Sequence, residues 1–79
     1  MSIGISLLKL KPGSTGQLMS LDALDPLVHR RLTDMGVRTG ATIRLHKVTP
    51  LGGPVIIECN GQLIGLRQKQ AGHMEVCLA

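Results

Sequence analysis

The apolar residues of this chain change from helical spacing to alternation near Gly40, and that change restricts the folds open to it. One stripe at helical intervals of four, four and three precedes the change and consists of Leu24, Val28, Leu32 and Met35. After it, apolar and polar residues alternate, which is the pattern of strands with one buried face. The sequence therefore predicts one α-helix followed by several short strands.

The predicted helix, near residues 25–35, carries a start signal and a stop signal. Asp25 can accept a hydrogen bond from a free N–H of the first turn, and Pro26 suits the first helical position, which needs no N–H. Gly36 can end the helix because glycine tolerates the left-handed backbone conformation. A helix of about ten residues is therefore expected here.

Short strands are predicted on both sides of this helix, over residues 16–21, 42–46, 55–59, 62–67 and 74–78. In the first strand we expect Leu18 on one face and Met19 and Leu21 on the other. Single helical turns are expected within 6–10 and in the connector 68–72. The strands are too short to bury much surface as a flat sheet.

Turns are expected where glycine or asparagine separates these elements. Gly36 and Gly40 are expected to be structural turn positions, and Asn60-Gly61 predicts a two-residue hairpin because both turn residues need positive φ. Closure into a small barrel would hide the strand edges, and the helix could plug one open end. The predicted fold class is mainly β: a small SH3-like barrel of five or six strands with one α-helix, a single domain over residues 1–79.

The composition excludes several functions. The chain has no Phe, Tyr or Trp, so its core must be aliphatic. It cannot build the aromatic grooves, stacking platforms or cages that hold proline-rich peptides, single-stranded nucleic acid or methyl-ammonium groups. No apolar run approaches the roughly 20 residues of a membrane span. Two cysteines are too few for a disulfide scaffold, so we expect a cytoplasmic protein with free thiols and no membrane insertion.

Several segments resemble one bacterial family in order and spacing. They are residues 29–37, Gly40, residues 50–54, 66–71 and 74–76, with further matches at Leu7, Leu10, Pro12 and Gly13. Together they resemble ferrous iron transport protein A, the FeoA family, over nearly the whole chain. The same domain also ends some iron- and manganese-dependent repressors, but we expect no helix-turn-helix in front of it here, which makes a repressor the weaker interpretation.

The resemblance implies a small cytoplasmic SH3-like protein that accompanies a membrane ferrous iron transporter with a cytoplasmic GTP-binding domain. It implies a regulatory or assembly role exerted through protein contacts. It brings no catalytic set and no cofactor, and the sequence itself contains no nucleophile elbow or phosphate-binding loop. We therefore expect a protein that is not an enzyme. The sequence leaves a homo-oligomer open.

Two segments are candidates for partner binding. The first is the loop of Leu51, Gly52, Gly53 and Pro54, which follows Pro50. Leu51 either stands exposed for a partner to bury or folds back onto the barrel, and the sequence leaves both open. The second segment is Arg30 and Arg31 on the solvent-exposed side of the predicted helix. These two side chains either bind an acidic partner or are only solvated, and the sequence leaves both open.

The alternative function is a basic small barrel that binds nucleic acid or senses a metal. The net charge of +4 favours nucleic acid, but the basic residues form no run in sequence, so we expect no nucleic-acid partner.

The candidate metal ligands are His73, Glu75 and Cys77. They are spaced by two, so one strand could aim all three at one face. Side chains so spaced diverge on a straight strand, so we expect no tight metal site in the monomer; the sequence leaves open a site shared by two chains. Cys59 is expected to be buried and Cys77 to be the more accessible thiol.

Overall fold

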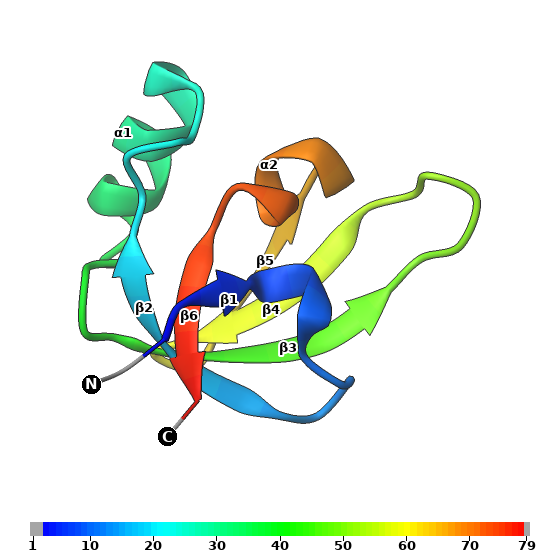
Figure 1. Ribbon diagram of the computed structural model, residues 1–79. Helices are drawn as coiled ribbons and strands as arrows, with labels where there is room; N and C mark the ends of the chain where they lie inside the picture. Colours follow the sequence, from blue (N-terminus) through cyan, green and yellow to red (C-terminus); the bar gives the residue numbers. More distant parts are fainter. Residues whose placement is uncertain (1–2, 79) are drawn as a thin grey trace.

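A single antiparallel sheet forms most of the computed structural model, which describes residues 3–78 (Figure 1). Along the chain the elements are β1 (Ile5–Ser6), the 3₁₀ turn η1 (Leu7–Lys9), β2 (Thr15–Ser20), α1 (Pro26–Asp34), β3 (Thr42–Val48), β4 (Val55–Cys59), β5 (Gln62–Leu66), α2 (Gln68–Gly72) and β6 (Glu75–Leu78). The chain is thus a mainly β, SH3-like barrel of six strands with one longer helix, which confirms the predicted fold class.

The strands follow the order β1-β6-β2-β3-β4-β5. Breaks in register lie between Leu18 and Ser20 in β2 and between Leu45 and Lys47 in β3. Such bulges bend and twist the bulged strand, which lets a short sheet curl around its own core. The predicted closure is nevertheless incomplete: β1 and β5 are the two ends of the described sheet, so each keeps one edge without a strand partner.

The core is aliphatic throughout, as a chain without aromatic residues requires. Its buried members are Leu7, Leu10, Leu18, Leu21, Leu24, Leu32, Val37, Ile43, Leu45, Val55, Ile57, Cys59, Ile64, Leu66, Ala71, Met74 and Val76. Leu18 and Leu21 are both buried, so our placement of them on opposite faces was wrong. The bulge after Leu18 inserts one residue, which resets the alternation and turns Leu21 inward.

The helix α1 begins and ends at the residues that the sequence indicated. The backbone N–H of Leu27 donates a 2.9 Å hydrogen bond to the Asp25 carboxylate, and Pro26 occupies the first helical position. Gly36 follows the helix at φ 87°, and Gly40 ends the next turn at φ 91°. Leu32 is the fully buried residue of the helix, which lies over one end of the sheet (Figure 1). Among the described residues no helix is long and apolar enough to cross a bilayer.

Candidate functional site

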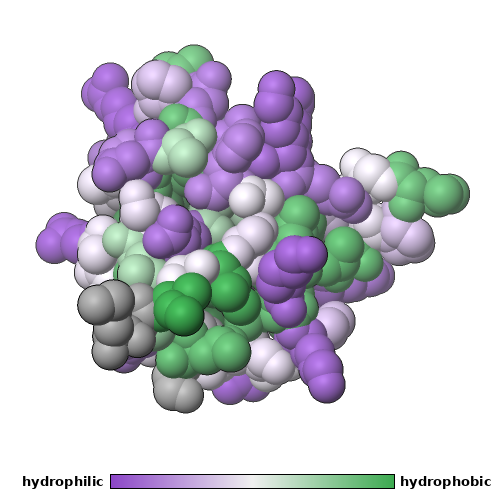
Figure 2. Space-filling view, in the orientation of Figure 1, coloured by the Kyte–Doolittle hydropathy of each residue, from purple (hydrophilic) through white to green (hydrophobic). Residues whose placement is uncertain are grey.

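The loop between β3 and β4 projects away from the body of the barrel (Figure 1). Figure 2 shows that this projection carries hydrophobic atoms at its end. Leu51 is located in this loop and is fully exposed, with a relative accessibility of 104%. Of the two alternatives, folding of Leu51 back onto the barrel was therefore wrong. A fully exposed leucine on a projection is available for a partner to bury.

The backbone at Leu51 is in an unusual conformation for leucine. Leu51 has φ 60° and Gly52 has φ 79°, and the N–H of Gly53 donates to the carbonyl oxygen of Pro50 at 3.3 Å. Two central residues at positive φ are the mark of a type I′ turn, which normally takes asparagine and glycine. Leucine is disfavoured there because its Cβ crowds the backbone. The backbone of Leu51 is thus strained, and burial of its side chain within the chain does not compensate for this strain.

Hydrogen bonds at its base hold the loop. The N–H of Thr49 donates to the carbonyl oxygen of Pro54 at 3.1 Å, and the Gln68 side-chain amide donates to the carbonyl oxygen of Thr49 at 3.0 Å. A Cβ at Gly53 would lie 2.5 Å from the Thr49 Cγ2, so the loop's own packing requires glycine there. The two glycines therefore shape the turn, and Leu51 is the residue left to make an outside contact.

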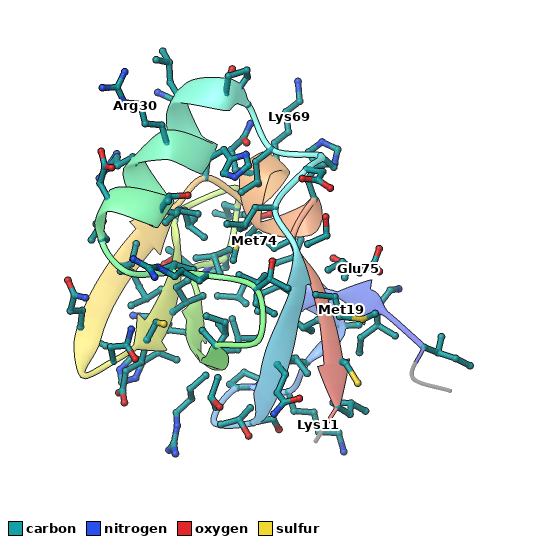
Figure 3. The ribbon with its side chains drawn as sticks, turned by 90° about the vertical axis from the view of Figure 1, so that its left-hand side faces the viewer. Lys11, Met19, Arg30, Lys69, Met74 and Glu75 are labelled. Carbon is teal, nitrogen blue, oxygen red and sulfur yellow. The ribbon has the colours of Figure 1, made fainter. Side chains whose placement is uncertain are left out.

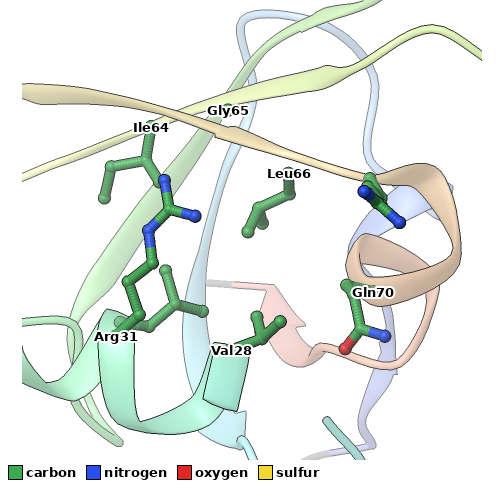
Figure 4. A pocket seen from close by; sticks show the side chains of 8 residues that line it. Val28, Arg31, Ile64, Gly65, Leu66 and Gln70 are labelled. Atoms are coloured by element: carbon green, nitrogen blue, oxygen red, sulfur yellow. The ribbon is translucent and has the colours of Figure 1, made fainter. Parts of the chain in front are cut away.

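Arg30 and Arg31 lie on α1, on the other side of the barrel from this loop (Figure 1). Both are exposed, but they diverge: Arg30 points away from the barrel (Figure 3), whereas Arg31 reaches toward β5 (Figure 4). Lys11 lies at the opposite end of the molecule from Arg30 and Lys69 (Figure 3). The basic side chains therefore do not all gather on one face of the molecule.

The structure does not bring His73, Glu75 and Cys77 onto one strand face. The strand β6 begins at Glu75, and His73 has helical backbone angles at the end of α2 (φ −89°, ψ −6°). The histidine therefore lies outside the strand that carries Glu75 and Cys77. Between them Met74 points into the core, while Glu75 lies at the surface (Figure 3). Within residues 3–78, no three His, Cys, Asp or Glu side chains are arranged to hold a metal ion.

The two thiols lie in different surroundings. Cys59 is buried in the core, and this burial raises the pKa of its thiol above the ordinary value. Cys77 is partly exposed, and its Sγ lies 3.4 Å from the carbonyl oxygen of Leu78. The prediction that Cys77 is the more accessible thiol is confirmed.

Comparisons with known proteins agree on one family. The sequence profile of the FeoA domain matches residues 5–77. The solution structure of the FeoA protein of Chlorobium tepidum is 35% identical in sequence, with a TM-score of 0.86 over 94% of this chain and 70% of that one. A zinc complex of FeoA from Stenotrophomonas maltophilia, described as a prokaryotic SH3 domain protein and candidate activator of ferrous iron transport, has 22% identity and a TM-score of 0.73, over 94% and 88% of the two chains.

The same fold occurs in a second class of protein. A manganese-dependent transcriptional repressor superposes with a TM-score of 0.86 at 16% identity, over 100% of this chain and 44% of the repressor. At that identity the likeness extends to the fold alone. No protein with curated annotation matches the chain.

Proposed function

Because the chain belongs to the FeoA family, we propose that it acts in the cytoplasm as an accessory protein of bacterial ferrous iron transport. In this proposal it acts without catalysis, by contact with the membrane transporter whose cytoplasmic side carries a GTP-binding domain. The partner's identity comes from the family resemblance. The mode of contact rests on one observation, the fully exposed leucine at the tip of the loop between β3 and β4.

The conformation of Leu51 supports a role in docking. A left-handed backbone at a non-glycine residue costs about 1–2 kcal/mol, and Leu51 recovers none of it by burial within the chain. Full burial of a leucine side chain by a partner is worth about 1.5–3 kcal/mol. A strained residue whose side chain is not buried within the chain fits a functional site better than a structural one.

The stiffness of the loop supports the same role. Pro50 and Pro54 restrict the backbone at both ends, and the hydrogen bonds of Thr49 hold the base. A loop that is ordered before docking loses little conformational entropy on binding. Most of the free energy gained by burying Leu51 would therefore remain as affinity.

Leu51→Asp tests the proposal in a binding assay with the purified cytoplasmic part of the transporter. We expect binding to weaken by tenfold or more, since about 1.4 kcal/mol is a factor of ten. The matched control is Leu27→Asp, which removes another exposed leucine, 78% accessible, from α1. It should leave binding within about twofold.

Salt separates this proposal from the nucleic-acid alternative. A contact centred on Leu51 should weaken little between low and high salt, whereas binding to phosphates falls steeply. Circular dichroism should show that Leu51→Asp remains folded, because its side chain has no place in the core. Equal binding by wild type and a folded Leu51→Asp would rule the loop out, and Arg30 and Arg31 on α1 would then be the surface to vary.

A further inference from the structure

Hydrogen bonds tie the C-terminal end of the helix α1 to the start of β5 and the turn before it, and its N-terminal end to α2. At its C-terminal end, the Gln62 side-chain amide donates to the carbonyl oxygen of Met35 at 2.9 Å, and that of Asn60 donates to Gly36 at 3.3 Å. At its N-terminal end, the N–H of Asp25 donates to the side-chain oxygen of Gln70 in α2 at 3.0 Å. The helix therefore crosses β5, and a cleft lies between the middle of the helix and this strand (Figure 4).

This cleft has apolar walls and a basic rim. Its lining comprises Val28, Arg31 and Leu32 of α1, Ile64, Gly65 and Leu66 of β5, and Arg67 and Gln70 beyond it. Arg31 extends from the helix toward the strand (Figure 4). Of these described lining residues none is acidic, so the two guanidinium groups have no carboxylate among them. The volume of about 120 Å³ admits one side chain but no strand of backbone.

The free edge of β5 borders the same cleft. Cys59 and Gln62 flank a two-residue turn and form a hydrogen-bonded pair, so the alternation of an antiparallel ladder gives the next such pairs at Ile64 and Leu66. The N–H and C=O groups of Leu63 and Gly65 therefore point away from β4. On that side β5 is the last strand of the described sheet. It offers backbone donors and acceptors to a further strand.

Gly65 is not explained by the fold itself. Its φ is outside the left-handed region, and an added Cβ would meet only the Ile56 Cδ1, at an ordinary 3.7 Å. Neither the backbone nor the packing thus requires a glycine at this position. A glycine inside a strand often marks a place where another backbone approaches closely. At Gly65 the approaching backbone would lie along the open edge of β5, beside the cleft.

We propose that this edge binds an extended acidic peptide of a protein partner. The peptide adds as a strand along Leu63 and Gly65, and one of its carboxylate side chains enters the cleft between Arg31 and Arg67. Backbone hydrogen bonds would give affinity, and the paired arginines would select a carboxylate. A second copy of this chain is disfavoured as the occupant, because the chain carries a net charge of +4 and each copy would bring its own Arg67 to the shared edge. The site is separate from the Leu51 loop and does not depend on the transporter as partner.

An NMR titration of the full chain tests this proposal. The probe is a blocked peptide of about six residues, the length of a typical strand, in which valine alternates with glutamate. We expect the amide signals of Leu63 and Gly65 to shift, and binding to weaken as salt rises. The same peptide with lysine in place of glutamate should not bind. Equal binding of the lysine peptide, or shifts confined to other surfaces, would overturn the proposal.

Point variants separate the arginines from general charge effects. Arg31→Glu and Arg67→Glu should each weaken binding of the glutamate peptide about tenfold. The matched control Arg30→Glu makes the same charge change one residue from Arg31, outside the cleft, and should change binding less than threefold. If Arg30→Glu has as large an effect as Arg31→Glu, the cleft is not the site.

A backbone variant tests the strand addition directly. Gly65→Pro removes the outward N–H, and β4 does not use that group, so the ladder should survive while peptide binding is lost. Because this variant can also disturb the fold, the arginine variants carry the test if its spectrum is not native. Leu51→Asp should bind the peptide as wild type does, so failure here and failure of the proposed transporter contact are distinguishable.

Discussion

Replacement of Leu51 by asparagine should stabilise this protein while removing its proposed docking residue. Leu51 and Gly52 have φ 60° and 79°, and Asn60 and Gly61 have φ 53° and 77°. The chain thus contains two turns of the same backbone geometry, one with the favoured asparagine and one with leucine. Leu51→Asn makes the first turn like the second.

The structure sets the size of the expected gain. A leucine in the left-handed region costs about 1–2 kcal/mol, and asparagine, which visits this region readily, recovers a good part of that. Nothing is lost in packing because Leu51 is fully exposed. A gain of about 1 kcal/mol should raise the melting temperature by about 4–8 °C in a domain of this size. Thermal unfolding followed by circular dichroism suits the measurement, since the chain has no aromatic fluorophore.

Leu63→Asn is the matched control for this prediction. Leu63 is also exposed, at 59%, but lies in β5, where asparagine is disfavoured. The same chemical change should therefore leave the melting temperature unchanged or lower it. A melting temperature of Leu51→Asn at or below that of the wild type would refute the strain argument. If Leu51→Asn is more stable and binds the transporter's cytoplasmic part more weakly, stability and function are opposed at this residue.

Four further predictions concern the turn, the reactivity of the thiols, the pKa of Cys59 and metal binding. Gly61→Val should destabilise by about 2 kcal/mol because a β-branched residue is disfavoured at φ 77°, whereas Gly65→Ala should not; equal melting temperatures would contradict the turn assignment. In the folded protein Cys77 should react with an alkylating reagent, and Cys59 only on unfolding. Comparable alkylation rates of the two thiols would contradict the burial of Cys59. Because burial raises the pKa of Cys59, the free energy of unfolding should hold below about pH 9 and fall as the pH rises through the raised folded pKa. Urea unfolding should give a lower free energy of unfolding at about pH 10 than at about pH 8 in wild type, and no such difference in Cys59→Ala. Equilibrium dialysis of the monomer should find no tightly bound Fe²⁺ or Zn²⁺, and one tight ion that His73→Ala does not disturb would contradict this expectation and the proposed ligand set.

The parts of the fold that the sequence predicted depend on near neighbours along the chain. The cap at Asp25, the stop at Gly36 and the hairpin at Asn60-Gly61 are each decided within a few residues. The errors occurred where a local pattern met a longer-range irregularity. One inserted residue in β2 reversed the side of Leu21, and the late start of β6 left His73 outside the strand. A bulge has no reliable sequence signal because it is set by the partner strand.

The candidate site was only partly visible from the sequence. Prolines and glycines marked the Leu51 loop, but whether Leu51 folded back depended on the body of the barrel and on the hydrogen bond from Gln68 to the loop base. The cleft at β5 was missed, although a glycine inside a predicted strand, Gly65, was a signal for it. Nothing in the sequence indicated that Arg67 would lie at the same cleft as Arg31.

The sequence alone determined that the chain would be a small aliphatic β barrel with one capped helix, because side-chain periodicity, caps and turn residues act over short distances. Tertiary structure alone decided which strands remain edges and what lies beside them. Hydrogen bonds that the side chains of Asn60 and Gln62 donate and that of Gln70 accepts fix α1 across β5 and so bring Arg31 to the same cleft as Arg67. Residues so far apart in the chain meet only through the packing of complete elements, and periodicity, which describes one element at a time, does not specify that packing.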